Sequence, residues 1–386
     1  MIGFHVTLLR AIWIDLTNDG RQSILAARAR RPMPGRDQEI GELVFIERPR
    51  PFRYDEETGT PLDFDGTVFD PYSARNIPWK TTVLDKGPDV MFSVADLDPT
   101  DDSVEVIASQ FFGQRITLHS IQRGPSPQVT TRRVIDDRCG ASFSAILANL
   151  FPGAKHPTGV FENVPSVVDC GSTVSTLKKG DMFSHILVTS HECSFEEEKT
   201  YSTTKDRLRD SSFESNVIVG SDISNRISGG SLFAYRVPES WRTDDIWERD
   251  VMATGFRVRG QIGNMINPGA PGFCYTFYPT LEGSKRWSRP FIGIAGDCAE
   301  AAYILRPDCD DTPPGCEIEL STKYALMCEI DCGGTVGSLA IGYGDCCNAP
   351  SEQGWAKIYM PSYENDKIFA IGMGTGDEGG DESSLL

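Results

Sequence analysis

A pattern of four short apolar strands returns five times along the 386-residue chain. Its third strand, which usually closes on proline, recurs as GELVFIERP (41–49), QRITLHSIQ (114–122), GSLFAYRVP (230–238), AEAAYILRP (299–307) and GWAKIYMP (354–361). Repeated four-stranded units are typical of propeller blades, each of which buries its faces only against its neighbours. The repeat therefore predicts an all-β chain forming a single five-bladed β-propeller of four-stranded blades. In such a fold, function is expected at one mouth of the central channel.

The predicted propeller spans residues 1–375, followed by an acidic, flexible tail at 376–386. Its blades are expected at about 1–87, 88–138, 139–253, 254–322 and 323–375. The first strands of the blades are predicted as LLRAIWID (8–15), DVMFSVAD (89–96), SFSAILAN (142–149), RVRGQIGN (257–264) and YALMCEID (324–331). The N-terminal strand either begins the first blade or completes the last.

Charge and hydropathy narrow the possible partners. The formal charge of −18 disfavours binding to nucleic acid or to an anionic membrane, because both need a basic patch. No window approaches 18 uninterrupted apolar residues, so no membrane insertion is expected. The N-terminal stretch lacks the features of a secretory signal, because polar residues interrupt its apolar run.

Eleven cysteines are more than a cytosolic chain of this size normally carries. The candidates for pairing are Cys309 with Cys316, and the crowded group Cys328, Cys332, Cys346 and Cys347. Structural disulfides are therefore predicted, and with them the secretory pathway or an extracellular location in preference to the cytoplasm.

Long insertions are predicted to build one rim of the propeller. Residues 50–77, 150–183 and 264–289 emerge on the same rim, whereas the polar segment 194–229 falls on the opposite one. The same-rim insertions are rich in aromatic residues, which is typical of lids and binding loops. The alternative is that they form a small apolar core over the end of the propeller.

Period-two alternation separates two faces of each first strand. One face of RVRGQ carries Arg257, Arg259 and Gln261, where the neighbouring first strands are mostly apolar or small. Buried guanidinium groups need acceptors, so these residues either hydrogen-bond an oxygen-rich ligand in the channel or form an ion pair with Asp89 or Glu329. The predicted catalytic set is Arg257, Arg259, Gln261, Tyr324 and His185. The predicted substrate-binding set is Arg10, Trp13, Phe92, Ser93, Phe273, Tyr275, Phe277 and Met327.

Two Asp-rich turns, DLTNDG (15–20) and DLDPTDD (96–102), follow predicted first strands. They resemble the turns of FG-GAP or VCBS propeller repeats, in which alternate carboxylates sometimes hold Ca²⁺. Here the candidate ligands are Asp15, Asp19, Asp96 and Asp98, but Asp also closes tight turns by bonding its own backbone. No cofactor or catalytic metal is predicted. Nucleophile-elbow, P-loop, dinucleotide and H-E-x-x-H motifs are absent from the sequence.

Together with these turns, stretches such as DVMFSVADLDPTDDSVEVIASQFFG and FRVRGQIGNMINPGAPGFCYTFYP resemble stand-alone fungal propeller proteins, the hetero-Diels–Alderases of tropolonic sesquiterpene biosynthesis. The resemblance implies a cofactor-free pericyclase that joins a tropolone quinone methide to a humulene-type olefin. In that interpretation the arginines and Gln261 bind the tropolone oxygens, and Tyr324 or His185 assists loss of water.

Two other functions stay open. A sugar lyase resembling the propeller part of aldos-2-ulose dehydratases would also use an Arg-lined channel, together with a metal or a base. A non-catalytic ligand-binding propeller would need no polar channel. The sequence leaves the oligomeric state undetermined.

Overall fold

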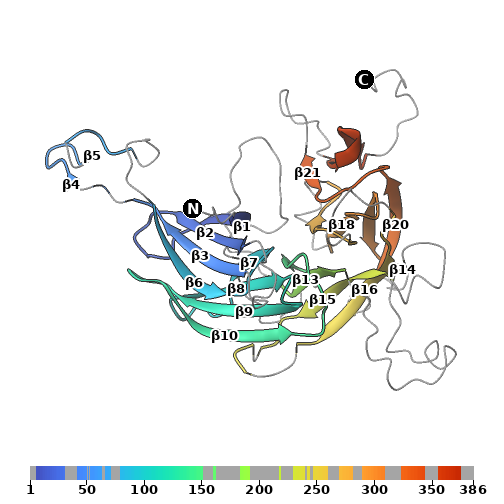
Figure 1. Ribbon diagram of the computed structural model, residues 1–386, viewed down its shortest axis with the longest axis horizontal. Helices are drawn as coiled ribbons and strands as arrows, with labels where there is room; N and C mark the ends of the chain where they lie inside the picture. Colours follow the sequence, from blue (N-terminus) through green and yellow to red (C-terminus); the bar gives the residue numbers. More distant parts are fainter. Residues whose placement is uncertain are drawn as a thin grey trace, which may run out of the picture. The chain divides into compact units, whose positions relative to one another are not determined.

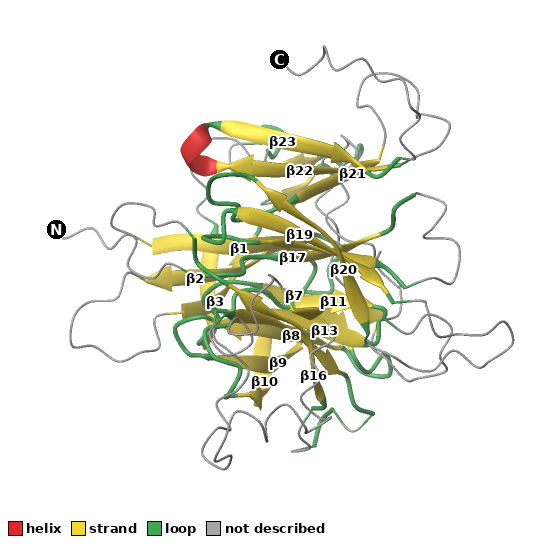
Figure 2. Ribbon diagram, turned by 90° about the vertical axis from the view of Figure 1, so that its right-hand side faces the viewer, coloured by secondary structure: helices red, strands yellow, loops and turns green. Residues whose placement is uncertain are grey.

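The computed structural model describes residues 6–30, 41–49, 51, 53–62, 66–70, 79–150, 160–161, 183–191, 217–218, 229–239, 241–243, 247–259, 269–280, 289–308, 323–343 and 355–374. The chain divides into two compact units. Unit 1 comprises Met1–Ala145 and Gly159–Ser166, and unit 2 comprises Ile146–Thr158 and Val167–Leu386. Among the described residues the regular secondary structure is almost all β-strand, with one short 3-10 helix at Tyr363–Asn365 (Figures 1 and 2).

Unit 1 contains two large sheets and a small hairpin. Sheet 1 has the order β1-β2-β3-β6, with β1 at Val6–Ile14, β2 at Ser23–Arg30, β3 at Gly41–Glu47 and β6 at Lys80–Lys86. Sheet 2 has the order β10-β9-β8-β7-β12, with β7 at Phe92–Asp96, β8 at Ser103–Gln110, β9 at Arg115–Gln122, β10 at Gln128–Asp136 and β12 at Val160–Phe161. Strands β4 (Arg53–Tyr54) and β5 (Pro61–Leu62) form the hairpin, which lies within the predicted insertion 50–77.

Unit 2 contains three sheets. Sheet 3 has the order β11-β13-β15-β16-β14, with β11 at Ile146–Ala148, β13 at His185–Ser190, β14 at Val217–Ile218, β15 at Gly230–Arg236 and β16 at Arg249–Phe256. Sheet 4 has the order β17-β18-β19-β20, with β17 at Cys274–Phe277, β18 at Phe291–Ala295, β19 at Ala301–Pro307 and β20 at Tyr324–Asp331. Sheet 5 has the order β21-β22-β23, with β21 at Ala340–Tyr343, β22 at Ala356–Ser362 and β23 at Lys367–Gly372.

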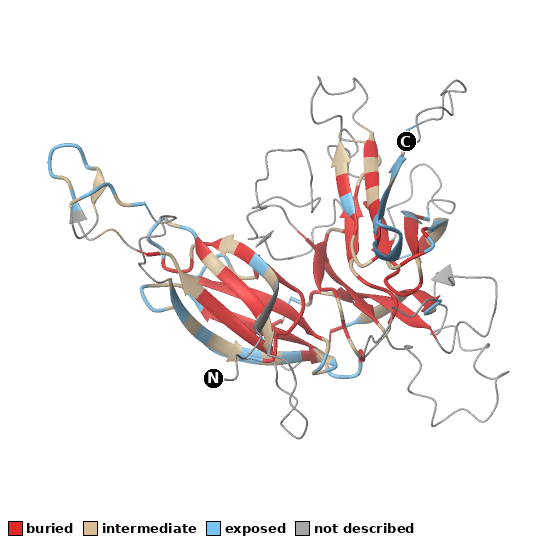
Figure 3. Ribbon diagram, turned by 45° about the horizontal axis from the view of Figure 1, so that its top comes forward, coloured by how far each residue is buried: buried red, intermediate tan, exposed pale blue. Residues whose placement is uncertain are grey.

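Hydropathy explains the position of each strand in its sheet. In sheet 2 every residue of the interior strand β8 is buried, whereas β10 at the edge is exposed or half-buried at all positions but one. Chain neighbours pair antiparallel throughout these two strands and β9. Figure 3 shows the same gradient from buried to exposed across the larger sheets. In sheet 2 the interior strand therefore carries a buried, mostly apolar run, and the edge strand β10 carries charges.

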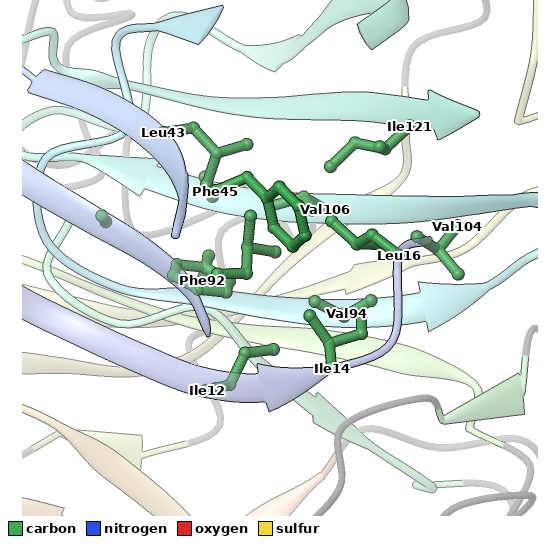
Figure 4. Close-up of a cluster of buried hydrophobic side chains, with 13 residues drawn as sticks. Ile12, Ile14, Leu16, Leu43, Phe45, Phe92, Val94, Val104, Val106 and Ile121 are labelled. Atoms are coloured by element: carbon green, nitrogen blue, oxygen red, sulfur yellow. The ribbon is translucent and has the colours of Figure 1, made fainter. Parts of the chain in front are cut away.

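The core of unit 1 lies between sheets 1 and 2. Apolar side chains of the two sheets point toward one another there (Figure 4). Leu25 and Leu43 come from sheet 1, and Phe92 and Val106 come from sheet 2, all with no exposed surface. Burial of large side chains of this kind stabilises by roughly 1.5–3 kcal/mol each. Face-to-face packing of consecutive sheets thus holds this unit together.

The all-β prediction is confirmed, but the fourth repeat is shifted. Arg257 to Arg259 lie beyond the end of β16 and are not in a strand, so the predicted first strand at 257–264 is wrong as far as the structure describes it. The first strand of sheet 4 is instead β17, which falls inside the predicted aromatic insertion 264–289. Cys274, Thr276 and Phe277 are buried, so this segment packs as a buried edge strand of sheet 4 and not as a lid.

The boundary between the fourth and fifth repeats is displaced for the same reason. Tyr324–Asp331, predicted to begin the last blade, pairs along its length with β19 as the last strand of sheet 4. Sheet 5 consequently has three described strands, although four were predicted. The tail at 376–386 lies outside the described residues.

The predicted disulfides are not seen at the described cysteines. Cys139, Cys274, Cys298, Cys328 and Cys332 all carry free thiols, including the two expected to belong to the crowded group near the last repeat. Cys309, Cys316, Cys346 and Cys347 lie outside the described residues. Among the described residues there is no helix both long and apolar enough to cross a membrane.

Candidate functional site

The predicted catalytic arginines do not line an interior strand. Arg259 is 43% exposed and forms an ion pair with Glu329 of β20, which is one of the two partners that the sequence offered for a structural pair. Both residues belong to unit 2. Arg257 is half-buried after the end of β16, and Gln261 lies outside the described residues. The alternation argument fails here because it assumed a strand, whereas the described residues Arg257 to Arg259 lie outside any strand.

Tyr324 and His185 have structural partners. The Tyr324 hydroxyl is buried and donates to the Pro290 carbonyl at 2.9 Å, and the Arg289 guanidinium lies over its ring. His185 begins β13, is 1% exposed, and its Nδ1 lies 2.8 Å from the Ser184 hydroxyl. These contacts place both side chains within the packing of unit 2.

The predicted substrate-binding residues are divided between the two units. Arg10, Trp13, Phe92 and Ser93 belong to unit 1, and the remaining four belong to unit 2. In unit 1, Phe92 is part of the core, and the Ser93 hydroxyl donates to the Ala145 carbonyl at 2.8 Å. The Trp13 ring lies against the Trp79 ring in a tilted arrangement, and Arg10 is half-buried on β1.

In unit 2, the other predicted substrate-binding residues have packing roles or lie at the surface. Phe277 is buried in sheet 4, and the Tyr275 hydroxyl is 2.7 Å from that of Ser338. Met327 is 48% exposed on β20. Phe273, half-buried before β17, retains a partly accessible side chain.

The Asp-rich turns use their carboxylates to bond backbone amides. Asp15 accepts from the amides of Thr17 and Gly20, and Asp19 accepts from Arg21, with which it also forms an ion pair. Asp96 and Asp98 accept from the amides two residues further on. These bonds are those of Asx-type turns. Within the described parts of the chain, no three His, Cys, Asp or Glu side chains gather in a way that would hold a metal ion.

One cluster in unit 2 has a different character. His191 directly follows β13, and Asp297 and Cys298 lie in the turn between β18 and β19. The His191 Nε2 atom lies 3.9 Å from Asp297 Oδ2, and the two side chains are only 10% and 12% exposed. The Cys298 thiol approaches the other carboxylate oxygen at 3.9 Å. We refer to His191, Asp297 and Cys298 as the acid–base cluster.

The turn that carries Asp297 is held by backbone hydrogen bonds on several sides. The amide of Asp297 donates to Val336 at 2.8 Å, and Val336 donates back to the Asp297 carbonyl at 3.2 Å. Asp297 and Glu300 both have positive φ angles, of 52° and 57°. A non-glycine residue in this region costs of order 1 kcal/mol or more and persists where its surroundings fix it. The sequence thus fixes Asp297 at the end of a buried strand in an unfavourable backbone conformation.

Close packing fixes the imidazole of His191. A side chain at Gly269 would overlap the ring, since a Cβ there would lie 1.8 Å from Nδ1. The ring also hydrogen-bonds the Pro271 carbonyl. Cys298 joins the same wall through its own backbone, because its amide donates to Gly269 and its carbonyl accepts from Arg259. The cluster is therefore assembled from the ends of strands in sheets 3 and 4.

Burial displaces both titrations of the cluster. Desolvation raises the pKa of Asp297 from 3.8 to about 6, and the negative charge of Glu364 adds to this. Desolvation also lowers the pKa of His191 from 6.5 to about 4. The imidazole is therefore neutral at pH 7, and its approach to Asp297 is not an ion pair. Burial raises the pKa of the Cys298 thiol as well, so the thiol stays protonated.

These shifts define what the cluster can do chemically. Between about pH 4 and 6, Asp297 carries a proton while His191 is neutral. A neutral imidazole has one N–H donor, which here bonds Pro271, and one nitrogen that accepts a proton. A carboxylic acid and a neutral imidazole side by side form a general acid and a general base in one place.

Sequence reasoning treated His191 as an ordinary polar residue and did not single out Asp297. The available signal was positional, because both residues come directly after buried strands, at the ends of HILVTS and FIGIAG. Their proximity depends on the pairing of segments more than 100 residues apart, which a single sequence does not reveal.

The class that the structure defines is an all-β chain of consecutive antiparallel sheets, with an acid–base cluster where strands of two sheets end. Comparison with profiles of known protein families and with curated proteins finds no match to this chain.

Proposed function

We propose that the five sheets are the blades of a five-bladed propeller, and that the protein is a cofactor-free enzyme that removes water from a small hydroxylated substrate. Following the resemblance of its sequence, the substrate is a hydroxymethyl tropolone. The resulting quinone methide then adds to a humulene-type olefin in a hetero-Diels–Alder reaction. Consecutive meander sheets of three to five strands support the propeller arrangement.

The observation that carries the proposal is the buried His191–Asp297 pair with its displaced pKa values. Loss of water breaks the bond between the hydroxymethyl carbon and its oxygen, and a ring hydroxyl loses its proton. Asp297 donates its proton to the departing hydroxyl, and His191 accepts the proton of the ring hydroxyl. Water and the neutral quinone methide are the products, and a proton passing from His191 back to Asp297 restores the pair. Positioned acid–base catalysis of this kind contributes typically about 10²–10⁴-fold.

The joining step transfers no proton. It forms one carbon–carbon and one carbon–oxygen bond between the diene and the olefin, so the protein contributes by holding two apolar partners together. Orientation of two reactants contributes up to about 7–11 kcal/mol of the barrier. Phe273, half-buried beside Gly272 in the segment that also forms the wall behind His191, is the aromatic residue best suited to contact them.

The decisive experiment compares two Asp→Asn variants. We expect Asp297→Asn to lower the rate of adduct formation about 10²–10⁴-fold, because the general acid is lost. Asp85→Asn is the matched control, since Asp85 is paired with a histidine in unit 1 but keeps a lowered pKa. The products are measured by chromatography and mass spectrometry after confirming that both variants are folded. Equal rates in the two variants would remove Asp297 from the reaction.

The pH dependence gives an independent test of the pair. The rate is expected to be highest between about pH 4 and 6 and to fall on both sides, as His191 becomes protonated below and Asp297 ionises above. His191→Gln should remove the acid limb while leaving the alkaline limb of Asp297.

A sugar lyase would draw on the same observation, because eliminating water from a sugar also needs an acid and a base. The two functions are separated by substrate and by chelation. Turnover of an aldosulose that EDTA abolishes favours the lyase, whereas chelator-resistant formation of the tropolone adduct favours the pericyclase. Binding of either compound without turnover would instead support a non-catalytic propeller.

A further inference from the structure

The outer edge of sheet 5, formed by β23, differs from the outer edges of sheets 1, 2 and 4, formed by β6, β10 and β20. Strand β23 is the last strand of this sheet, and no other described strand pairs with its far side. Sheet 5 also has three described strands, whereas sheets 1 and 4 each have four. An unpaired strand edge presents a row of amide and carbonyl groups to any other strand that can approach it.

Charge protects the outer strands of sheets 1, 2 and 4 (β6, β10 and β20) from such pairing. Strand β6 carries Lys80, Asp85 and Lys86, and β10 carries Arg132, Arg133 and Asp136. Strand β20 carries Glu329 and Asp331. In β23 the single charged residue is Lys367, at its first position. Charged side chains are a common defence of an open edge, and β23 carries fewer of them than β6, β10 or β20.

Apolar side chains take the place of those charges. Ile368 is 72% exposed and Ile371 is 36% exposed, and both lie on β23 with Phe369 half-buried between them. Exposed β-branched residues along an open strand edge are suited to cross-strand packing with another strand.

The hydrogen-bond pattern fixes which groups of β23 face outward. The Met373 amide donates to Ala356 of the neighbouring strand β22, and Lys357 pairs with Gly372 in the same register. Bonding toward one neighbour alternates along an antiparallel strand. Phe369 and Ile371 therefore bond toward β22, and the amide and carbonyl groups of Ile368, Ala370 and Gly372 point outward.

We propose that this edge pairs with the same edge of a second copy of the chain, forming a two-fold symmetric dimer with a continuous sheet. An antiparallel self-pairing requires outward-facing residues to meet one another, and a register centred on Ala370 satisfies this. It places Phe369 opposite Ile371 of the second copy and Ile368 opposite Gly372. Lys367 then meets Met373, so no like charges are opposed. The sequence of β23 is thus complementary to itself in the register that its hydrogen bonds allow.

The test uses the full-length protein and measures its mass in solution by sedimentation and light scattering. Wild-type protein is expected to be a dimer at micromolar concentration. Ala370→Pro removes one outward amide without touching the bonds to β22, and Ile371→Lys introduces a charge at the contact. Each is expected to raise the dimer dissociation constant about 10–100-fold, from the loss of two symmetry-related hydrogen bonds or two symmetry-related apolar pairs. Val134→Lys is the matched control, because Val134 is similarly exposed, at 42%, on the outer strand β10.

Hydrogen exchange gives a second readout that does not depend on mass alone. In the dimer the amides of Ile368, Ala370 and Gly372 should be protected, and dilution or Ile371→Lys should release them together. A wild-type protein that stays monomeric at 100-fold higher concentration overturns the proposal. A monomer in which these three amides are nevertheless protected also overturns it, because another strand of the same chain would then occupy the edge. Neither result bears on Asp297 or on adduct formation.

Discussion

Each unit of the molecule contains a buried histidine beside an aspartate, and the two pairs differ in how fully they are bonded. In unit 1, His119 Nδ1 lies 2.7 Å from Asp85 Oδ2, and His119 Nε2 lies 2.9 Å from the Thr117 hydroxyl. In unit 2, the nearest approach of His191 to Asp297 is 3.9 Å. The same two residue types are thus held in a tight contact in one place and in a loose one in the other.

The tight pair is part of a directional chain of hydrogen bonds. Arg115 donates to Gln110, and Gln110 donates to the Thr117 hydroxyl oxygen. The Thr117 hydroxyl is left to donate to His119 Nε2, which assigns the ring proton to Nδ1 and directs it to Asp85. Each side chain in this series of hydrogen bonds, from Arg115 to Asp85, has a bonding partner. The network therefore joins strands β6, β8 and β9.

Electrostatics separates the two aspartates in the same way. Burial alone would raise the pKa of Asp85, but hydrogen bonds from His119 and Lys86 lower it below its ordinary value. The pKa of Asp297 is raised to about 6, since burial is not offset by comparable bonds. The Asp85 carboxylate is stabilised in its charged form, so it holds no proton to donate near neutral pH. A carboxyl whose charge is poorly stabilised is suited to acid catalysis.

The largest effect on stability is expected at the tight pair. His119→Leu leaves the Asp85 carboxylate and the Thr117 hydroxyl without their shared partner in a buried site, so we expect a loss of about 3 kcal/mol in the free energy of unfolding. His191→Leu should cost no more than about 1 kcal/mol, because one hydrogen bond to Pro271 is lost. Urea denaturation of both variants makes the comparison. Similar losses would mean that the two histidines are equally structural.

The contribution of the His191–Asp297 pair to the free energy of unfolding should change little with pH in the wild-type protein. In variants that lack one of the two residues, it should change steeply. The raised pKa of Asp297 makes the free energy of unfolding fall as pH rises from about 4 to 6, because in this range the folded state keeps a proton on Asp297 that the unfolded state has lost. The lowered pKa of His191 makes stability rise from about pH 4 to 6.5, because the unfolded state binds the proton better. Each shift of about two units corresponds to roughly 3 kcal/mol, and the two slopes oppose one another.

Substitution of either His191 or Asp297 should reveal how the other residue alone makes the free energy of unfolding depend on pH. Relative to wild type, Asp297→Asn should lose about 3 kcal/mol as pH falls from 6.5 to 4, and His191→Gln should lose about the same as pH rises from 4 to 6. Unfolding free energies at pH 4, 5, 6 and 7 measure both. Parallel curves for wild type and the two variants would show that the pair does not titrate as proposed.

The loose pair also marks what the sequence could not reveal. Alternating and continuous apolar runs predicted the all-β class and placed the third strands β3, β9, β15 and β19 correctly, because these strands are mostly buried on both faces. The prediction of the fourth repeat failed where RVRGQIGN and YALMCEID both satisfied the strand pattern. The second segment forms a strand, whereas the described part of the first, Arg257 to Arg259, does not. Local alternation of apolar and polar residues does not reveal which strands pair with one another. The actual strand pairing leaves Arg259 outside the candidate site and places His191 beside Asp297.

The smallest effect is expected at the exposed ion pair between Arg259 and Glu329. Arg259 is 43% exposed, so solvent screens its attraction to Glu329, and Arg259→Leu should change the unfolding free energy by no more than about 1 kcal/mol. Arg28→Leu is the matched comparison, because Arg28 and Glu42 are only 20% and 10% exposed and two guanidinium nitrogens contact the same carboxylate oxygen. It should cost about 1.5–3 kcal/mol. Arg259→Leu should also leave adduct formation unchanged, whereas a rate loss comparable to that of Asp297→Asn would restore the arginine to the catalytic site.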